Sequence, residues 1–313
     1  MIEFISVMSE LGAGTRGSSL GLEAMKMASY KEENPFFETF TLHTVSTRNE
    51  DLAKEVVKPA GKRITGIAHM YQAIAESVSK VAGSSSFPFV LSGDHSNAGG
   101  TMAGLKKAFP DKRMGVIWVD AHADLHSPFT SPSGNVHGMP VATALSEDNL
   151  ECKINDPKPE TLEAWNSMKG DSQRLLHSDV VFIAVRDTEH PENEIMRRNN
   201  IPNYTVDQVR EEGASQIAQK ALEYLAECDL IYVSFDVDSM DPSVSVGTGT
   251  PVPHGLTPEE ATDILNVFAA SPKLACMECT EINPLLDDKG NAMAETSLAI
   301  LKNVSNTLIQ NGK

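Results

Sequence analysis

Six side chains with a repeated spacing could hold metal ions in this 313-residue chain. They are His95, Asp120, His122, Asp124, Asp236 and Asp238. The polar residues of DAHAD alternate with alanines, the acids of FDVD are also two apart, and such residues share one face of an extended chain. Four carboxylates without a counter-charge would repel each other, whereas two divalent ions would offset them. Carboxylates suit manganese, and imidazole also admits iron, cobalt or nickel. None of the six residues is a cysteine, which argues against structural zinc.

Short apolar strands that alternate with helices must position these residues. The predicted strands are 2–7, 87–91, 114–119, 180–185, 230–235 and 274–279, and the predicted helices lie near 67–81, 96–108, 213–227, 258–270 and 293–309. Continuous apolar strands are typical of sheets covered on both faces, so the pattern predicts an α/β fold with a parallel sheet. GDHS, DAHAD, FDVD and CTEINP each follow a strand, at the carboxyl ends where such sheets bind ligands.

The composition limits the classes of function. Lys and Arg number 26 and Asp and Glu 43, a formal charge of -17 that suits a cationic ligand and disfavours nucleic acid. No apolar run is long enough to span a membrane, and no targeting segment is evident, so a cytoplasmic protein is expected. We expect one domain over residues 1–313, with a polar surface excursion containing one short helix at 147–171.

The four cysteines are too few for a disulfide scaffold in a chain of this length. Cys276 and Cys279 form a C-x-x-C pair within a predicted strand. Residues three apart in a strand point to opposite faces, so the pair is interpreted as two core residues rather than a redox or zinc site.

Five stretches resemble the ureohydrolase family, which includes arginase and agmatinase. They are GDHS (93–96), DAHAD (120–124), SGNVHGMP (133–140), SFDVDSMDP with GTGTP and GLT (234–257), and EINP (281–284), in the order typical of the family. The resemblance implies a three-layer α/β/α fold around a mainly parallel sheet, two Mn²⁺ per subunit, and a homotrimer or homohexamer. One ion would be held by His95, Asp120, Asp124 and Asp236, and the other by His122, Asp120, Asp236 and Asp238.

The serine, glycine and asparagine of SGNVHG resemble the arginase members most. That likeness implies hydrolysis of a small cationic guanidino substrate, L-arginine, to L-ornithine and urea by a hydroxide that bridges the two ions. Asp124 would pass a proton to the departing amine, Glu281 would pair with the guanidinium group, and His137 would shuttle protons. The implied substrate-binding residues are His126, Ser133, Asn135, Glu189 and Thr250.

Several positions depart from the arginase pattern and leave alternatives open. His126 stands where arginases commonly have Asn, Glu189 where they commonly have Asp, His254 where the family usually has Gly, and Val246 where it often has Pro. These changes favour, as an alternative, a hydrolase of another guanidino compound such as agmatine or a guanidino acid. Two further alternatives share the same architecture. A zinc deacetylase would have fewer carboxylate ligands than the six residues provide, and a non-catalytic binding protein would show no metal-dependent turnover.

Overall fold

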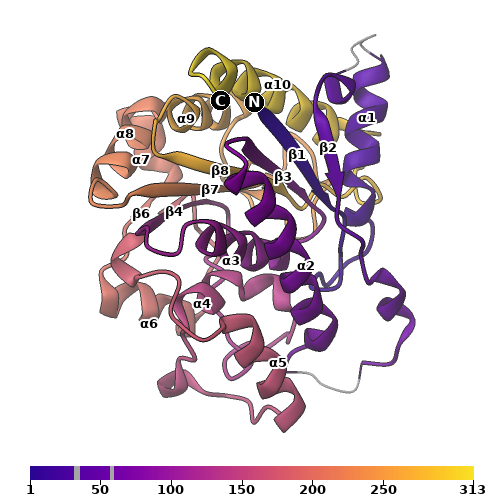
Figure 1. Ribbon diagram of the computed structural model, residues 1–313, viewed down its shortest axis with the longest axis vertical. Coiled ribbons are helices and arrows are strands. Elements are labelled where there is room, and N and C mark those ends of the chain that lie inside the picture. Colours follow the sequence, from indigo (N-terminus) through magenta and orange to yellow (C-terminus); the bar gives the residue numbers. More distant parts are fainter. Residues whose placement is uncertain (32–35, 57–59) are drawn as a thin grey trace.

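The computed structural model describes residues 1–31, 36–56 and 60–313, and in these ranges it contains one eight-stranded sheet between two layers of helices (Figure 1). The strands are β1 (Ile2–Val7), β2 (Thr41–Thr44), β3 (Phe87–Ser92), β4 (Met114–Val119), β5 (Val180–Ile183), β6 (Asn203–Tyr204), β7 (Leu230–Asp236) and β8 (Leu274–Thr280). Their order is β2-β1-β3-β8-β7-β4-β5-β6, and every neighbouring pair is parallel. The predicted α/β fold is confirmed.

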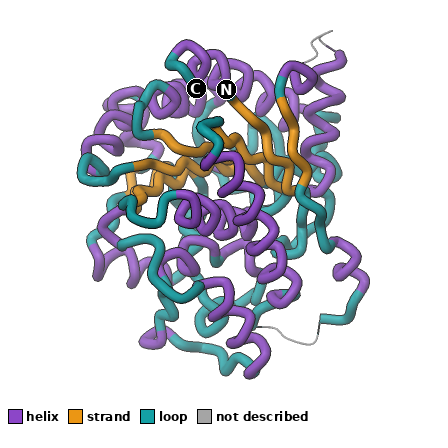
Figure 2. The backbone as a smooth tube through the Cα atoms, viewed as in Figure 1, coloured by secondary structure: helices purple, strands orange, loops and turns teal. Residues whose placement is uncertain are grey.

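Helices cover both faces of the sheet (Figure 2). Residues of α1 (Gly21–Lys31), α7 (Val206–Glu212), α8 (Ala214–Tyr224), α9 (Pro258–Ala269) and α10 (Ala292–Gln310) belong to one hydrophobic core. Residues of α2 (Ile64–Gly83), α3 (Ala98–Ala108), α4 (Pro140–Leu145), α5 (Pro159–Lys169) and α6 (His190–Asn199) belong to a second core. The sheet therefore separates two cores, as in a three-layer α/β/α sandwich.

The local sequence explains these elements. In β4, Val116 and Trp118 belong to one core and Ile117 and Val119 to the other, which is why the strand is apolar throughout. In α9, Thr257 is the N-cap residue and Pro258 follows at the first helical position. The hydroxyl of Thr257 accepts the N–H of Glu260 at 3.1 Å, and this capping bond begins the helix where the sequence indicates.

The structure adds elements that the apolar pattern does not reveal. The strands β2 and β6 lie at the two edges of the sheet and are half-buried or exposed, so they lack a continuous apolar run. The helices α1, α4, α6 and α7 were likewise not predicted. The predicted short helix within 147–171 is confirmed as α5, which buries Trp165 in the same core as α2. None of the described helices is both long and apolar enough to cross a membrane.

The four strands that precede the polar clusters are direct neighbours in the sheet, in the order β3-β8-β7-β4. Because all four are parallel, the residues that follow them meet at the carboxyl end of the sheet. The cysteine prediction is also confirmed, since Cys276 and Cys279 of β8 belong to the cores on opposite faces. The central strands thus bring together segments almost two hundred residues apart.

Candidate metal centre and active site

Three aspartates at or just after strand ends turn the chain in the same way. Oδ1 of Asp94, Asp120 and Asp236 accepts a hydrogen bond at 2.7–2.8 Å from the backbone N–H two residues further on. This Asx turn lets the chain leave the strand abruptly. The second oxygen of Asp94 is also used, because it accepts the N–H of Gly12 at 2.9 Å. In Asp120 and Asp236, by contrast, Oδ2 faces the centre of the site.

His95 is oriented so that one ring nitrogen faces the carboxylates. Its ring stacks on Trp118 with centroids 4.0 Å apart, and Nε2 lies 2.8 Å from Oγ of Ser234. A partner on one imidazole nitrogen sets the direction of the other. Nδ1 therefore faces three carboxylate oxygens at 2.9–3.2 Å, which belong to Asp120, Asp236 and Asp124.

His122 forms a second cluster beside the first. Its Nδ1 lies 3.0 Å from Oδ2 of Asp238 and 3.4 Å from Oδ1 of Asp120. Two groups of possible ligands result, His95 with Asp120 and Asp236, and Asp120 with His122 and Asp238. Asp120 is common to both, as a bridging ligand would be. Asp236, which the resemblance also implies as a bridge, belongs to the first group.

Two of the predicted catalytic residues have a left-handed backbone. The φ angle is 52° at Asp124 and 68° at Glu281. The expectation of extended chain through DAHAD is wrong, because β4 ends at Val119 and the chain turns at Asp124. Aspartate tolerates this conformation better than most residues, and such strain concentrates at functional sites. The turn is consistent with the placement of the Asp124 carboxylate 3.2 Å from Nδ1 of His95.

The electrostatics of this cluster favour a cation. Burial raises the pKa of Asp236 well above its usual value, and nearby carboxylates raise it further. Burial and then the charge of Asp120 raise the pKa of Asp124 to about 7. Burial lowers the pKa of His95, but the surrounding carboxylates outweigh it and the net pKa is raised. A cluster that holds protons on its imidazoles in this way also attracts metal ions.

Unpaired buried atoms provide a test of whether metal ions fit. Nδ1 of His95 and Oδ2 of Asp120 are buried and have no properly aligned hydrogen-bond partner among the described residues. They lie only 2.9 Å apart, so both are directed at the same region. A buried polar atom without a partner is costly, and coordination would satisfy both atoms. The oxygen and imidazole ligands therefore fit divalent cations such as Mn²⁺.

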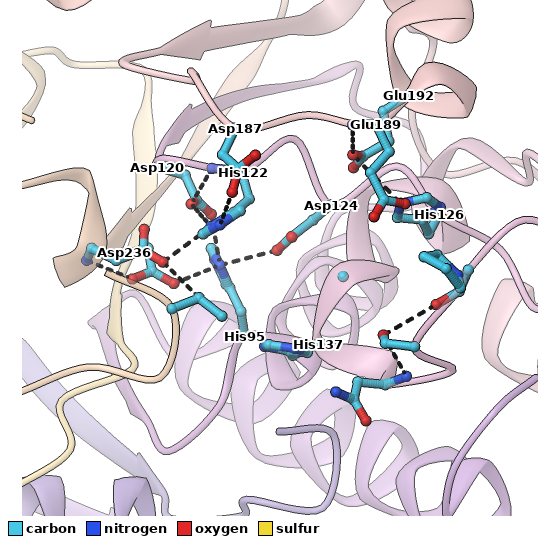
Figure 3. A pocket seen from close by; sticks show the side chains of 17 residues that line it. His95, Asp120, His122, Asp124, His126, His137, Asp187, Glu189, Glu192 and Asp236 are labelled. Atoms are coloured by element: carbon cyan, nitrogen blue, oxygen red, sulfur yellow. Dashed lines mark hydrogen bonds and ion pairs between the residues drawn. The ribbon is translucent and has the colours of Figure 1, made fainter. Parts of the chain in front are cut away.

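The same cavity has a second end, away from these ligands (Figure 3). Its volume is about 200 Å³, and its walls also include His126, Glu189 and Glu192. Nε2 of His126 lies 2.9 Å from Oε2 of Glu189 and 3.5 Å from Oε2 of Glu192. Burial lowers the pKa of His126 despite Glu189, and burial raises the pKa of Glu192 to about 7.

We call the six predicted ligands the metal end of the cavity. The outer end comprises His126, Ser133, Asn135, Glu189 and Glu192, all of which line the cavity. Ser133 and Asn135 lie on a loop that is stabilised by hydrogen bonds from its backbone to two serine hydroxyls. Oγ of Ser131 accepts the N–H of Gly134 at 2.9 Å, and Oγ of Ser133 accepts the N–H of Asn135 at 3.2 Å. All five predicted substrate-binding residues, Thr250 included, reach the cavity.

His137 lines the cavity and contacts Glu281. Nδ1 of His137 lies 3.3 Å from Oε1 of Glu281, and the N–H of His95 donates to the same oxygen at 3.0 Å. Burial lowers the pKa of His137, but Glu281 outweighs burial and the net pKa is raised. Among the described residues Glu281 does not line the cavity. In this structure its carboxylate therefore lies next to an imidazole rather than on the cavity wall.

Hydrogen bonds within the segment after β7, and from Arg186 after β5, hold the loop that carries Thr250 and His254. Oγ1 of Thr250 donates to Oδ2 of Asp238 at 3.1 Å, which connects this loop to a predicted metal ligand. The guanidinium group of Arg186 donates to the carbonyls of Val252 and Pro253 at 2.8 and 3.0 Å. His254 has a φ of 63°, a left-handed conformation that favours glycine, and this agrees with the family's preference there.

Sequence reasoning missed three polar residues that line the cavity. They are Ser131, Asp187 and Glu192. Oε2 of Glu192 accepts the N–H of Glu189 at 3.0 Å, and Oε1 accepts the N–H of Leu125 at 3.2 Å. A glutamate three residues after a helix start is the spacing of a capping box, which would have indicated Glu192. Asp187 follows the arginine of RDTE directly, and its Oδ2 lies 3.8 Å from Nε2 of His122.

Comparisons with known proteins identify the family to which this fold and this cavity belong. The model of the Arginase family matches residues 2–306, so the chain belongs to the arginase family. The chain is 33% identical to an arginase of Bacillus caldovelox, over 96% of each chain, and 30% identical to an arginase of Bacillus subtilis, over 97% of each. The solved native structure of the Bacillus caldovelox arginase has a TM-score of 0.82 and 31% identity, covering 100% of this chain and 98% of that one.

Proposed function

We propose that this protein is an arginase that hydrolyses L-arginine to L-ornithine and urea at a binuclear manganese centre. One observation carries the proposal: two ligand clusters that share Asp120 lie in the same cavity as a set of polar groups suited to an amino acid. The sequence relatives named arginase support it, since they match nearly the whole chain.

The metal end would hold the two ions. His95, Asp120, Asp124 and Asp236 would bind one, and His122, Asp120, Asp236 and Asp238 the other. When bound, the ions would neutralise the carboxylates and make water a stronger nucleophile at neutral pH. A guanidinium carbon is a poor electrophile because its charge is delocalised, so the nucleophile must also be well positioned.

The remaining residues would move protons and orient the substrate. Asp124 would carry a proton to the departing amine. His137 would exchange protons with solvent, since it is half-buried and lines the cavity. Glu281, whose Oε1 lies 3.3 Å from Nδ1 of His137, would set the position and charge of that imidazole. Glu281 would also pair with the guanidinium group.

The outer end suits a zwitterionic amino acid. Glu189, Glu192 and Asp187 would attract an α-ammonium group, and hydroxyl and amide groups of Ser133 and Asn135 would bind an α-carboxylate. The His126–Glu189 contact motivates the alternative, because an ammonium group must compete with the imidazole for Glu189. A guanidino compound that lacks one of the two charged groups would avoid that competition.

Urea release tests the proposal directly. The purified protein is stripped with chelator, reloaded with Mn²⁺, and supplied with arginine, agmatine or a guanidino acid. We expect urea from arginine only after metal is restored, with agmatine turned over less efficiently. A preference for agmatine or a guanidino acid would replace the substrate assignment, and urea production by the stripped protein would reject the metal centre.

We also propose a trimer or hexamer in the cytoplasm, with no nucleic-acid or membrane partner. The formal charge of -17 supports the absence of a nucleic-acid partner. Sedimentation velocity of the manganese-loaded protein measures the assembly, and a monomer would contradict it. Fractionation of the native cells measures the compartment.

A further inference from the structure

Lys62 binds the loop that carries part of the outer end. Its backbone N–H donates to the carbonyl of Gly134 at 2.7 Å, and its Nζ donates to Oδ1 of Asn135 at 3.0 Å. Lys62 precedes α2 and lies outside every motif that predicted the site. Two hydrogen bonds thus attach it to the segment between Ser133 and His137.

The contact with Lys62 sets the orientation of the Asn135 amide. An ammonium group has donors only, so it must bind the carbonyl oxygen of the amide and leave Nδ2 directed elsewhere. Nδ2 has no hydrogen-bond acceptor within the described part of the chain, although Asn135 lines the cavity. A Cβ at Gly14 would lie 2.7 Å from Nδ2, so glycine there leaves room for the amide. Asn135 therefore presents free N–H donors to a ligand that carries an acceptor.

The charge of the cavity makes this donor important. Seven carboxylates line the described cavity, and neither lysine nor arginine does; the acids are Asp120, Asp124, Asp187, Glu189, Glu192, Asp236 and Asp238. Two divalent ions would offset only four of these charges, so an anionic group would be repelled at the outer end. Lys62 places a positive charge on the far side of Asn135, and its bond to Oδ1 polarises the amide and strengthens the N–H donors.

We propose that Lys62 is a positioning residue that orients Asn135 and thereby selects guanidino substrates that carry a carboxylate. The inference rests on the proposed function, because it concerns the carboxylate end of an arginine-like substrate. Lys62 acts through Asn135 and does not touch the substrate.

The test uses the Lys62→Met variant of the manganese-loaded protein, which keeps the length of the side chain and removes its charge. We expect KM for arginine to rise about tenfold while kcat changes less than about twofold, because the lost interaction serves binding. Titration calorimetry should show that ornithine binds about tenfold more weakly, because one charge-assisted hydrogen bond is lost. Binding of putrescine, the same diamine without the carboxylate, should be unchanged.

Further variants separate positioning from a structural role. Asn135→Ala should cause a similar loss, and the double variant Lys62→Met/Asn135→Ala should lose no more than Asn135→Ala alone. Lys62→Arg should recover part of the ornithine affinity, and the exposed Lys107→Met on α3 should change nothing. Equal losses of ornithine and putrescine binding, or no change in either, would overturn the proposal. If the wild-type protein releases no urea from arginine, the proposed function fails, and the two binding titrations still decide the role of Lys62.

Discussion

The metal end and the outer end of the cavity differ in the backbone that carries them. At the metal end, Asp120 and Asp236 stand at or just after the ends of adjacent central strands and are at most 2% exposed. At the outer end, Glu189 lies at the start of a helix and its side chain is 51% exposed, while Ser133 and Asn135 lie on a loop. Rigid strand ends suit metal ions, which need fixed ligand positions, whereas loops can adapt to different substrates.

Two of the four departures from the arginase pattern lie at the outer end. All six metal ligands that the resemblance implies are present, but His126 and Glu189 differ at the outer end. The two altered residues contact each other at 2.9 Å. The comparison of the two ends predicts that variants at the metal end will lose metal ions, whereas variants at the outer end will lose affinity for the substrate.

The largest effect is expected at Asp120, which belongs to both ligand clusters. The metal affinity of the Asp120→Asn variant should fall more than about 100-fold, because the loss of a direct ligand costs more than the loss of a residue that is hydrogen-bonded to a ligand. Urea release should fall with it. Metal content after dialysis, measured by mass spectrometry, checks this. The exposed Asp263→Asn on α9 is the matched control. Full metal content in Asp120→Asn would show that this carboxylate is not a ligand.

A smaller effect is expected from His126→Ala at the outer end. This variant removes the side chain that contacts the Glu189 carboxylate, and it should lower kcat/KM for arginine about tenfold, mainly through KM, because Glu189 loses the contact that holds it in the binding region. Metal content should remain that of the wild type. Steady-state kinetics with the exposed His190→Ala as control measures it. Loss of metal from His126→Ala would mean that the two ends are not independent.

The smallest effect is expected from Glu147, which contacts α6, the helix that carries Glu192 of the outer end. Its Oε2 lies 2.8 Å from Arg198 of α6 and 3.2 Å from His177. Burial raises the pKa of Glu147, but hydrogen bonds from His177 and Arg198 outweigh it and lower the pKa to about 2. A lowered pKa stabilises the fold above the unfolded value of 4.5, and this stability is lost as the pH falls toward 2.

Glu147→Gln should therefore lower the free energy of unfolding by about 1–2 kcal/mol near pH 6. The effect is smaller than for a fully buried ion pair, because the carboxylate is partly solvated. The difference from wild type should shrink between pH 4.5 and 2, and kcat should be unaffected. Urea denaturation across this range checks it, with Glu163→Gln on the exposed face of α5 as control. A difference that persists at pH 2 would assign the effect to packing.

The central part of the fold follows from local patterns. β1 and β4 have the predicted bounds, and β3, β7 and β8 extend only one residue beyond them, because strands covered on both faces are apolar throughout. The edge strand β2 and the short β6 escape prediction because one face or both meet solvent. Their residues, TLHT and NY, have no feature that distinguishes them from loops.

The sequence alone determined the α/β class and the residues of the metal end, because parallel strands must bring their carboxyl ends to one edge of the sheet. The tertiary structure decided what depends on packing between distant loops. It turned the chain at Asp124, placed Glu281 against His137 rather than on the cavity wall, and added Glu192 to the outer end. It also joined Lys62 to Asn135 across 73 residues, a contact that no local pattern encodes.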